Sequence, residues 1–323
     1  MTRLNNILNE SDKDAKICSE KQEDFKTSVS IGLPIYNGEK FIHEKINSLL
    51  KQTFTDFELI ISDNCSTDLT SQICKEYSNR DKRIIYFRQK KNIGSWANFA
   101  FVLNKASNKY FLWTAVDDFV LPQFIEENVK TLEADEKIAC SISKIRLFGK
   151  NTDKIQPNEK DSKIKKIKKN FLRNYGHMNT FPARGTFEKR INEYIKNLRH
   201  NQCFYGIYRT DLIKKAFITK PFLGQDACII FNILKFGELN VVNKVLMEVY
   251  DDGVSRRGMI GLAKALEYNL FSTIFPSYQF TKWCKENLGL KIFLKNLGFF
   301  IKINFISEIS LLIDILRKLV QRF

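Results

Sequence analysis

The sequence predicts an α/β protein with a mostly parallel sheet, and three observations support this. From residue 28 to residue 115, short runs rich in β-branched residues alternate with stretches of helical periodicity. The helical stretches are about 10–15 residues long, which suits right-handed crossovers between parallel strands. Neither a G-x-G-x-x-G turn after the first strand nor a Walker lysine loop occurs. The pattern therefore indicates a nucleotide-binding sheet that belongs neither to a dinucleotide dehydrogenase nor to a P-loop phosphotransferase.

Each element follows from its local pattern. The strands are buried runs such as VSIGLPIY, and the first helix carries Phe41, Ile42, Ile46, Leu49 and Leu50 at helical spacing. In chain order the expected elements are strand 29–36, helix 39–52, strand 57–62, helix 67–77, strand 83–88, helix 96–106 and strand 110–115.

Two adjacent aspartates, Asp117 and Asp118, follow the last of these strands and precede Pro122, which is expected to open a helix. Carboxylates at the C-terminal edge of an open α/β sheet lie where such sheets bind ligands. Carboxylate oxygens are ligands for a divalent cation, and a phosphate group is its expected companion. The alternative is that Asp118 caps the following helix and Asp117 is a solvated loop residue.

Polar residues also follow the first two strands. The first strand ends in Pro34-Ile-Tyr36-Asn37-Gly38, and the second ends in Asp63-Asn64. A carboxylate at the tip of a strand can accept hydrogen bonds from a base or a ribose. Ser66 or Thr67 is expected to cap the next helix, whose N-terminus favours an anion. A plain capped turn between strand and helix remains the alternative.

These segments, taken together and in this order, resemble a known family. The segments are Pro34 to Glu39, Gln52 to Asp68, Asn92 to Gly94, and Val116 to Asp118. They are similar to the ordered motifs of family 2 glycosyltransferases, which adopt the GT-A fold. The resemblance is close over 28–136 and looser as far as 252.

The resemblance implies a donor site for a nucleotide sugar. Tyr36 and Asp63 match the positions that hold the nucleobase and ribose, while Asn92 and Gly94 match the loop near the diphosphate. Asp117 aligns with the aspartate that binds Mn²⁺ or Mg²⁺. The preceding positions hold Ala115 and Val116 where the family commonly has a further acidic residue, so the metal site carries less negative charge. The implied substrate-binding residues are Pro34, Tyr36, Asn37, Asp63, Asn64, Arg88, Asn92, Gly94, Asp118 and Arg256.

The family also needs a base that takes the proton of the acceptor hydroxyl, because a neutral alcohol is a poor nucleophile. The segment from Phe222 to Leu234 resembles the family's Glu-Asp motif, with Gln225 in place of the glutamate and Asp226 retained. Asp226 is therefore the expected catalytic base, and a helix N-cap is the alternative. The segment from Cys203 to Leu212 resembles the acceptor-side lining. Arg256 lies in a segment that resembles the closing loop over the diphosphate.

The C-terminal tail of the chain is strongly basic. The formal net charge is +16, and residues 253–323 alone carry 11 basic and four acidic residues. This tail alternates basic residues with apolar stretches, but no uncharged run reaches the ~18 residues of a spanning helix. Such a pattern suits the interface of an anionic bilayer. The alternative is a helical tail that packs on the catalytic domain or on a second subunit.

The predicted organisation has three parts. Residues 1–27 form a polar extension, 28–252 a GT-A catalytic domain, and 253–323 a basic amphipathic helical tail. Within the domain, 28–136 is the donor-nucleotide half and 137–252 the acceptor half. The extension lacks an apolar signal-peptide core, which predicts a cytoplasmic protein. Seven scattered cysteines without C-x-x-C pairs fit a reducing compartment and no structural zinc.

The predicted function is that of an inverting glycosyltransferase, peripheral on the inner face of a membrane. It moves a sugar from a nucleotide-diphosphate donor to a lipid-linked or surface-polysaccharide precursor glycan. Two alternatives remain: a soluble transferase that acts on a protein or small molecule, and a non-catalytic sugar- or nucleotide-binding member of the fold. Nucleic acid is not an expected partner, because no recognition motif accompanies the basic charge.

Overall fold

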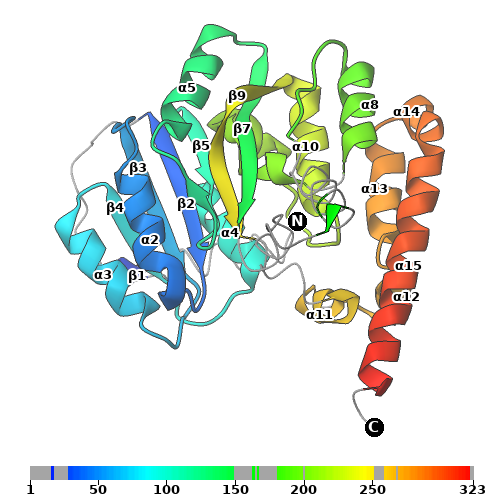
Figure 1. Cartoon of the computed structure of the whole chain (residues 1–323), viewed down its shortest axis with the longest axis horizontal. Helices are drawn as coiled ribbons and strands as arrows, with labels where there is room; N and C mark the ends of the chain where they lie inside the picture. The colour runs from blue at the N-terminus through cyan, green and yellow to red at the C-terminus, as the bar shows by residue number, and fades with distance from the viewer. Residues whose placement is uncertain are drawn as a thin grey trace.

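The computed structural model describes residues 16–17, 28–148, 162–163, 166, 180–198, 201–250, 258–266 and 268–320. Their strands form one sheet in the order β1-β4-β3-β2-β5-β8-β7-β9-β6, with helices packed around it (Figure 1). Each of the four parallel ladders contains between four and ten residue pairs, whereas each antiparallel ladder contains two. The predicted mostly parallel α/β architecture is confirmed.

The N-terminal half of the sheet matches the expected elements closely. Its strands are parallel because each return passes through a crossover helix. The strands are β2 (Val29–Ile35), β3 (Phe57–Asp63), β4 (Ile84–Arg88) and β5 (Tyr110–Trp113), and the helices are α2 (Glu39–Leu50), α3 (Thr70–Arg80) and α4 (Ser95–Lys105). A short strand β1 (Lys16–Ile17) pairs with β4 from within the predicted polar extension.

The second half of the sheet joins the first through a short antiparallel strand. β8 (Ile207–Arg209) pairs with β5 on one side and with β7 on the other. The remaining strands are β6 (Phe119–Val120), β7 (Ile138–Phe148) and β9 (Glu238–Tyr250), and the associated helices are α5 (Phe124–Ala134), α8 (Phe187–Asn197), η1 (Gln202–Tyr205), α9 (Thr210–Ala216) and α10 (Gln225–Phe236).

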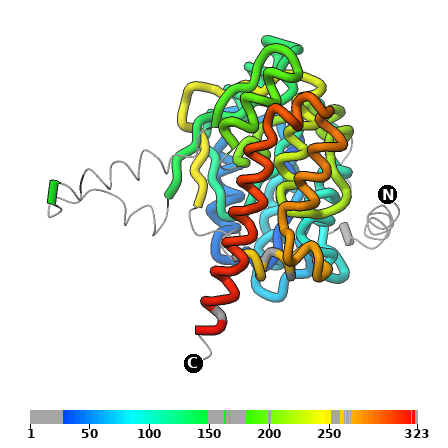
Figure 2. The backbone as a smooth tube through the Cα atoms, turned by 90° about the vertical axis from the view of Figure 1, so that its right-hand side faces the viewer, coloured from blue at the N-terminus to red at the C-terminus, as the bar shows by residue number. Residues whose placement is uncertain are grey.

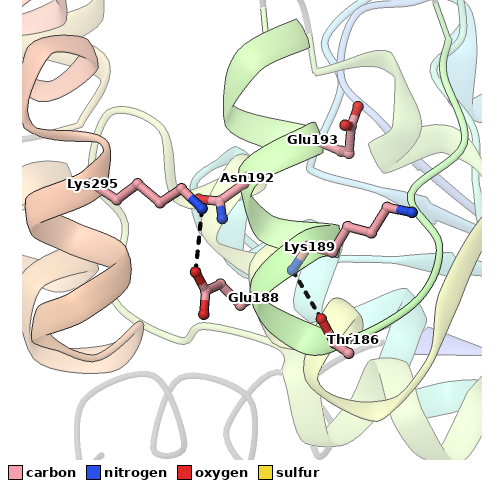
Figure 3. Close-up of a pocket in the computed structure, with 6 residues that line it drawn as sticks. All are labelled: Thr186, Glu188, Lys189, Asn192, Glu193 and Lys295. Carbon is pink, nitrogen blue, oxygen red and sulfur yellow. Dashed lines mark hydrogen bonds and ion pairs between the residues drawn. The ribbon is translucent and has the colours of Figure 1, made fainter.

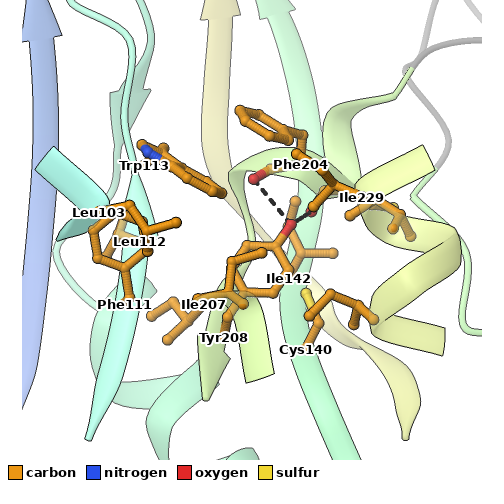
Figure 4. Close-up of a cluster of buried hydrophobic side chains, with 14 of the residues drawn as sticks. Leu103, Phe111, Leu112, Trp113, Cys140, Ile142, Phe204, Ile207, Tyr208 and Ile229 are labelled. Atoms are coloured by element: carbon orange, nitrogen blue, oxygen red, sulfur yellow. Dashed lines mark hydrogen bonds between the residues drawn. The ribbon is translucent and has the colours of Figure 1, made fainter. Parts of the chain in front are cut away.

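A buried cluster of hydrophobic side chains, with Trp113 and Phe204 among them, joins the two halves of the sheet (Figure 4). Trp113, the last residue of β5, stacks on Phe204 with ring centroids 4.7 Å apart. The Tyr208 hydroxyl donates hydrogen bonds to the carbonyls of Cys203 (2.7 Å) and Phe204 (3.0 Å). These contacts fix η1 against the end of β5, so the loop after β5 and Tyr205 keep a defined relative position.

The C-terminal region begins as a layer on the catalytic domain. Its helices are α11 (Gly258–Ala265), α12 (Leu270–Ile274), α13 (Tyr278–Asn287), α14 (Leu290–Lys295) and α15 (Leu297–Val320). Phe280 and Cys284 of α13 are buried, and Phe280 lies so close to Gly224 that a Cβ there would meet its ring at 2.7 Å. The alternative in which the tail packs on the catalytic domain therefore holds for α13 and α14.

The last helix, α15, continues past this layer. It runs along the edge of the molecule, and its C-terminal part extends beyond the body in both views (Figures 1 and 2). Among the described residues, no helix is both long and apolar enough to cross a membrane.

Candidate active site

The loops after β2, β3 and β4 bind one another at the C-terminal edge of the sheet. The Asn37 N–H donates to Ser66 Oγ, and the Thr67 N–H donates to Asn37 Oδ1, both at 2.9 Å. Ser66 and Thr67 therefore link two loops and do not cap α3, whose N-cap residue is Leu69. The predicted cap was wrong because the neighbouring loop competes for these polar groups.

Asp63 lies fully buried beneath this network. Its carboxylate accepts hydrogen bonds from the Ser66 N–H (2.8 Å), the Tyr86 hydroxyl (2.9 Å) and Arg88 Nη1 (2.6 Å). Arg88 also donates to the Ser66 carbonyl at 2.9 Å. Asp63 and Arg88 thus satisfy each other and hold the loop in shape. Their direct contact with a donor stays a prediction.

The loop before α4 is held by two asparagines. Asn64 Nδ2 donates to Asn92 Oδ1 at 3.0 Å, and Asn64 Oδ1 accepts from the Ile93 N–H at 2.8 Å. Gly94 has φ +86°, a conformation that side chains rarely adopt, and nothing lies where its Cβ would be. The loop therefore brings backbone to the N-terminus of α4, a position that favours an anion.

The remaining donor-side residues line the same edge. Pro34 is half-buried in β2 and pairs in register with Ser62 of β3. Tyr36, directly after that strand, is 49% exposed and thus accessible to a ligand. Arg256 lies outside the described residues.

Asp117 and Asp118 lie in contrasting environments. Asp117 is half-buried and makes no hydrogen bond or ion pair with another described residue. Asp118 is only 6% exposed, and its Oδ1 accepts from the Tyr250 N–H of β9 at 3.2 Å. Burial, with the neighbouring Asp117 charge, raises the pKa of Asp118 to about 7. Asp118 does not cap α5, whose N-cap residue is Gln123.

A buried lysine lies under the two aspartates. Lys45 of α2 is completely buried, and its ammonium donates to the Asp118 carbonyl oxygen. Burial lowers the pKa of Lys45 to about 8, while Asp118 and Asp117 oppose this shift. The sequence pattern contained a signal for this residue, because Lys45 lies between Ile42 and Leu49 on the apolar face of the helix. Sequence reasoning missed it.

The same helix fixes the rest of the loop after Asp118. Gln52 Nε2 donates to the Leu121 carbonyl at 2.8 Å, and Gln52 Oε1 accepts from the Ile125 N–H at 3.1 Å. The Thr53 N–H donates to the Pro122 carbonyl at 2.8 Å. α2 and the residues that follow it therefore hold the aspartate loop from behind.

Asp226 reaches the site from the first turn of α10. The N-cap residue of this helix is Gly224, with φ +86°, so Asp226 is not the cap. Burial raises the pKa of the Asp226 carboxyl above its usual range. The Asn201 amide opposes this by favouring the charged form, although it forms no hydrogen bond of good geometry.

The Tyr205 hydroxyl is affected both by the aspartates after β5 and by Asp226. Burial raises the pKa of its hydroxyl, and the charges of Asp118, Asp117 and Asp226 raise it further. Carboxylates from the loop after β5 and from α10 therefore act on one hydroxyl group. The predicted metal ligand and the predicted base thus both lie within electrostatic range of Tyr205.

The described residues do not form a complete metal site by themselves. They contain no group of three His, Cys, Asp or Glu side chains arranged to hold a cation. Asp117 offers one unengaged carboxylate, whereas Asp118 is buried above a lysine. Mg²⁺ commonly binds through one or two carboxylates together with substrate phosphates. The site fits a cation held jointly by Asp117 and a diphosphate, and not one held by protein groups alone.

Replacing Lys45 with methionine tests how the aspartate loop is held. Lys45→Met should destabilise the protein at pH 8 by roughly 1–3 kcal/mol, because a buried carbonyl loses its donor and Asp118 loses its cation. When folding raises the pKa of a carboxyl group, the protein loses stability as the pH rises through that raised pKa. The pKa of Asp118 is raised in this way, and removing Lys45 raises it further. The loss of stability caused by Lys45→Met should therefore be smaller at pH 5 than at pH 8. Urea unfolding at both pH values measures it.

The double variant Lys45→Met, Asp118→Asn is the control for this experiment. Asparagine still accepts from the Tyr250 N–H but carries no charge, so part of the lost stability should return. An equal loss of stability at pH 5 and pH 8, with no recovery in the double variant, would show that Lys45 acts only through packing.

A polar cavity of about 320 Å³ lies elsewhere, between α8 and α14 (Figure 3). Glu188 and Lys295 form an ion pair of 3.3 Å across it. The lining residues are Thr186, Glu188, Lys189, Asn192, Glu193 and Lys295. None of the predicted site residues lines this cavity.

Sequence comparison identifies the family. The model of the family described as glycosyl transferase family 2 matches residues 30–217, which is more than half of the chain. The chain belongs to glycosyl transferase family 2. An uncharacterized glycosyltransferase of Methanocaldococcus jannaschii is 29% identical over 213 residues, which are 62% of this chain and 73% of that relative. The family expected from the motifs is confirmed, and with it an enzyme of the glycosyltransferase class.

Other relatives of this glycosyltransferase align over shorter stretches. An uncharacterized glycosyltransferase of Haemophilus influenzae is 35% identical over 120 residues, 37% of each protein. The poly(ribitol-phosphate) beta-N-acetylglucosaminyltransferase TarS of Staphylococcus aureus is 33% identical over 100 residues, 30% of this chain and 18% of TarS. The chain thus spans well under two thirds of the length of these two relatives.

Solved structures confirm the fold. Crystal structures of S. aureus TarS 1-349, alone and in complex with UDP-GlcNAc, align with TM-scores of 0.52 and 0.54. They cover 86% of this chain and 81% and 82% of the solved chains, at 20% and 19% identity. The predicted GT-A fold is therefore the fold of this glycosyltransferase.

Proposed function

We propose that this glycosyltransferase is an inverting enzyme that takes a sugar from a nucleotide-diphosphate donor. The observation that supports this most strongly is the network of hydrogen bonds that joins the loops after β2, β3 and β4. Asp117, Asp118 and Asp226 all lie within electrostatic range of Tyr205. The loops come from the donor half, and α10 comes from the acceptor half. A sugar between them would face a carboxylate on its acceptor side.

The reaction follows from these positions. Asp226 takes the proton of the acceptor hydroxyl, and the acceptor oxygen attacks the anomeric carbon as the bond to the diphosphate breaks. The raised pKa of Asp226 makes it a stronger base than an ordinary carboxylate. The α4 N-terminus and the Asn64–Asn92 loop face the diphosphate. A divalent cation bound by Asp117 and the diphosphate would neutralise charge on the leaving group.

The acceptor that we propose is a lipid-linked or surface-polysaccharide precursor glycan. Support comes from the name of TarS, which describes transfer to a poly(ribitol-phosphate) polymer. A lipid-linked acceptor would bring the reaction to the cytoplasmic surface of the membrane. A soluble transferase for a protein or small molecule would instead need no lipid for activity.

A panel of nucleotide sugars tests the donor. A donor present at a free concentration of about 100 times its Kd stabilises the native state by about 2.7 kcal/mol and raises Tm by several degrees. Uridine diphosphate sugars are the first to test, because one of the similar TarS structures contains UDP-GlcNAc. Thermal unfolding is measured with each donor, with and without Mn²⁺, and donor consumption is then followed with a glycan acceptor.

The outcomes separate the proposed functions. A Tm rise with one donor, followed by transfer, supports the enzyme. A Tm rise without turnover on any glycan, protein or small-molecule acceptor would favour the non-catalytic sugar- or nucleotide-binding function. No response to any nucleotide sugar would contradict both.

A further inference from the structure

The outward face of α15 is a broad apolar surface that the rest of the described chain leaves uncovered. We call this surface the α15 face. Phe300, Ser307 and Leu311 mark the opposite, buried side of the helix. The central residues of the α15 face are between 41% and 63% exposed, and they are Ile301, Phe305, Ile309, Leu312, Leu316 and Leu319.

The width of the α15 face favours a flat partner over a single helix. In a two-stranded coiled coil the apolar seam is narrow and its flanks carry charges. Here the flanks carry exposed apolar residues as well, at Ile306, Ile313, Ile315 and Val320, beside the charged residues Lys302 and Glu308. By helical geometry the central and flanking residues span about half of the circumference, along a helix about 36 Å long. A second helix would cover only part of this surface, whereas a bilayer interface covers all of it.

A second exposed apolar group lies near the same end of the molecule. Leu270 is 77% exposed and Phe271 51% exposed on α12. The ring of Phe271 packs on Phe275 and Tyr278 at 5.2 and 5.1 Å between centroids, and both of these are also exposed. α11 packs against both α12 and α15, so it joins the two apolar groups. Aromatic and aliphatic side chains of this kind are typical of interfacial membrane anchors.

The charges around the α15 face complement an anionic surface. Residues 268–320 contain seven basic and three acidic residues. Lys302 lies within the exposed half of the helix, and the Arg317 side chain is 75% exposed although it forms an ion pair of 4.0 Å with Asp314. Asp314 turns inward, where it accepts a hydrogen bond from the Met259 N–H. A lysine within an apolar surface would be desolvated in a protein interface, but it can extend its ammonium into a headgroup layer.

From these observations we propose that the α15 face, with the exposed residues of α12, docks on the surface of an anionic lipid bilayer without spanning it. The proposal deepens the membrane location of the proposed function by naming the surface that makes contact. It does not depend on the identity of the donor or on the chemistry at Asp226.

The test measures vesicle binding by the full chain, because removing everything after Gly258 would also remove Phe280 and expose Gly224 and Phe231, which it covers. The variant Phe305→Gln, Ile309→Gln, Leu312→Gln, Leu316→Gln changes only exposed positions and keeps good helix formers. Co-sedimentation is measured with vesicles of phosphatidylglycerol and phosphatidylcholine, and with phosphatidylcholine alone. We expect the parent to prefer the anionic vesicles, less so at high salt, and the variant to bind at least ~10-fold more weakly.

A matched control replaces exposed apolar residues elsewhere, with Phe236→Gln and Val245→Gln, which are 47% and 44% exposed. The control should bind vesicles like the parent. Equal binding by the parent and the α15 variant, or no binding by the parent, would overturn the proposal. The proposal would also be overturned if the parent were a dimer, the α15 variant were a monomer, and neither bound vesicles. The α15 face would then be a contact between two copies of the chain. Donor binding by the variant should equal that of the parent, which separates this test from the test of the proposed function.

Discussion

Replacing Asp226 with asparagine is expected to lower turnover at least ~10²-fold while leaving donor binding nearly unchanged. Asparagine keeps the shape of the side chain at the start of α10 but cannot accept a proton. Because burial disfavours the charged carboxylate, its removal should leave the fold at least as stable at neutral pH. Single-turnover kinetics, donor titration and thermal unfolding measure the three quantities.

The pH dependence of the parent supplies a second measurement of the same role. A base must be deprotonated, so transfer should fall as pH decreases through the raised pKa of Asp226. Asn201→Asp keeps an oxygen to accept from the Tyr194 hydroxyl but places a negative charge near Asp226. The acidic limb of the profile should then move up by about one pH unit. An unchanged limb, or an Asp226→Asn protein that loses donor binding in place of turnover, would assign Asp226 a structural role.

The donor half was predictable because its signals are local. The strand predicted at 29–36 ends at Ile35 in the structure, and the helix predicted at 96–106 spans Ser95–Lys105. β-branched runs and helical spacing define such elements within a single window of sequence. The polar residues after these strands lie at one edge of the sheet, because parallel strands end at the same edge.

The acceptor half depends on contacts that no local window contains. β7 and β9 pair in parallel although about 100 residues separate them, and a two-residue strand, β6, adds to β9 across a similar separation. Periodicity cannot supply these pairings. The ion pair between Asp63 and Arg88 was not predicted for the same reason. Each residue was expected to contact the donor, and the structure shows that they also contact each other.

The buried lysine shows a further limit. Lys45 occupies an apolar-face position of α2, where a charged residue normally breaks the pattern. Only the three-dimensional structure shows the Asp118 carbonyl and the two carboxylates that make this burial tolerable. Lys45 on the apolar face of α2 was therefore a sequence signal for a buried polar partner.

Replacing Asp117 with asparagine is expected to abolish transfer and to remove the metal dependence of donor binding. Asp117 makes no hydrogen bond or ion pair with another described residue, whereas Asp118 is buried and accepts a hydrogen bond from Tyr250. A cation shared with a diphosphate needs that free carboxylate. Calorimetric titration of the donor, with and without Mn²⁺, measures the effect independently of turnover: the parent should bind more tightly with metal, and the variant should not.

Two further variants make the Asp117 result specific. Asp118→Asn should have a milder effect on metal-dependent binding, because its oxygen still accepts from the Tyr250 N–H and holds the loop. Asp211→Asn removes an exposed carboxylate paired with Lys215 on the surface and should match the parent. If the Asp117 variant transfers sugar as fast as the parent in saturating metal, Asp117 is not a ligand. Retained metal dependence of donor binding would lead to the same conclusion, because the cation would then be held by the donor and other groups.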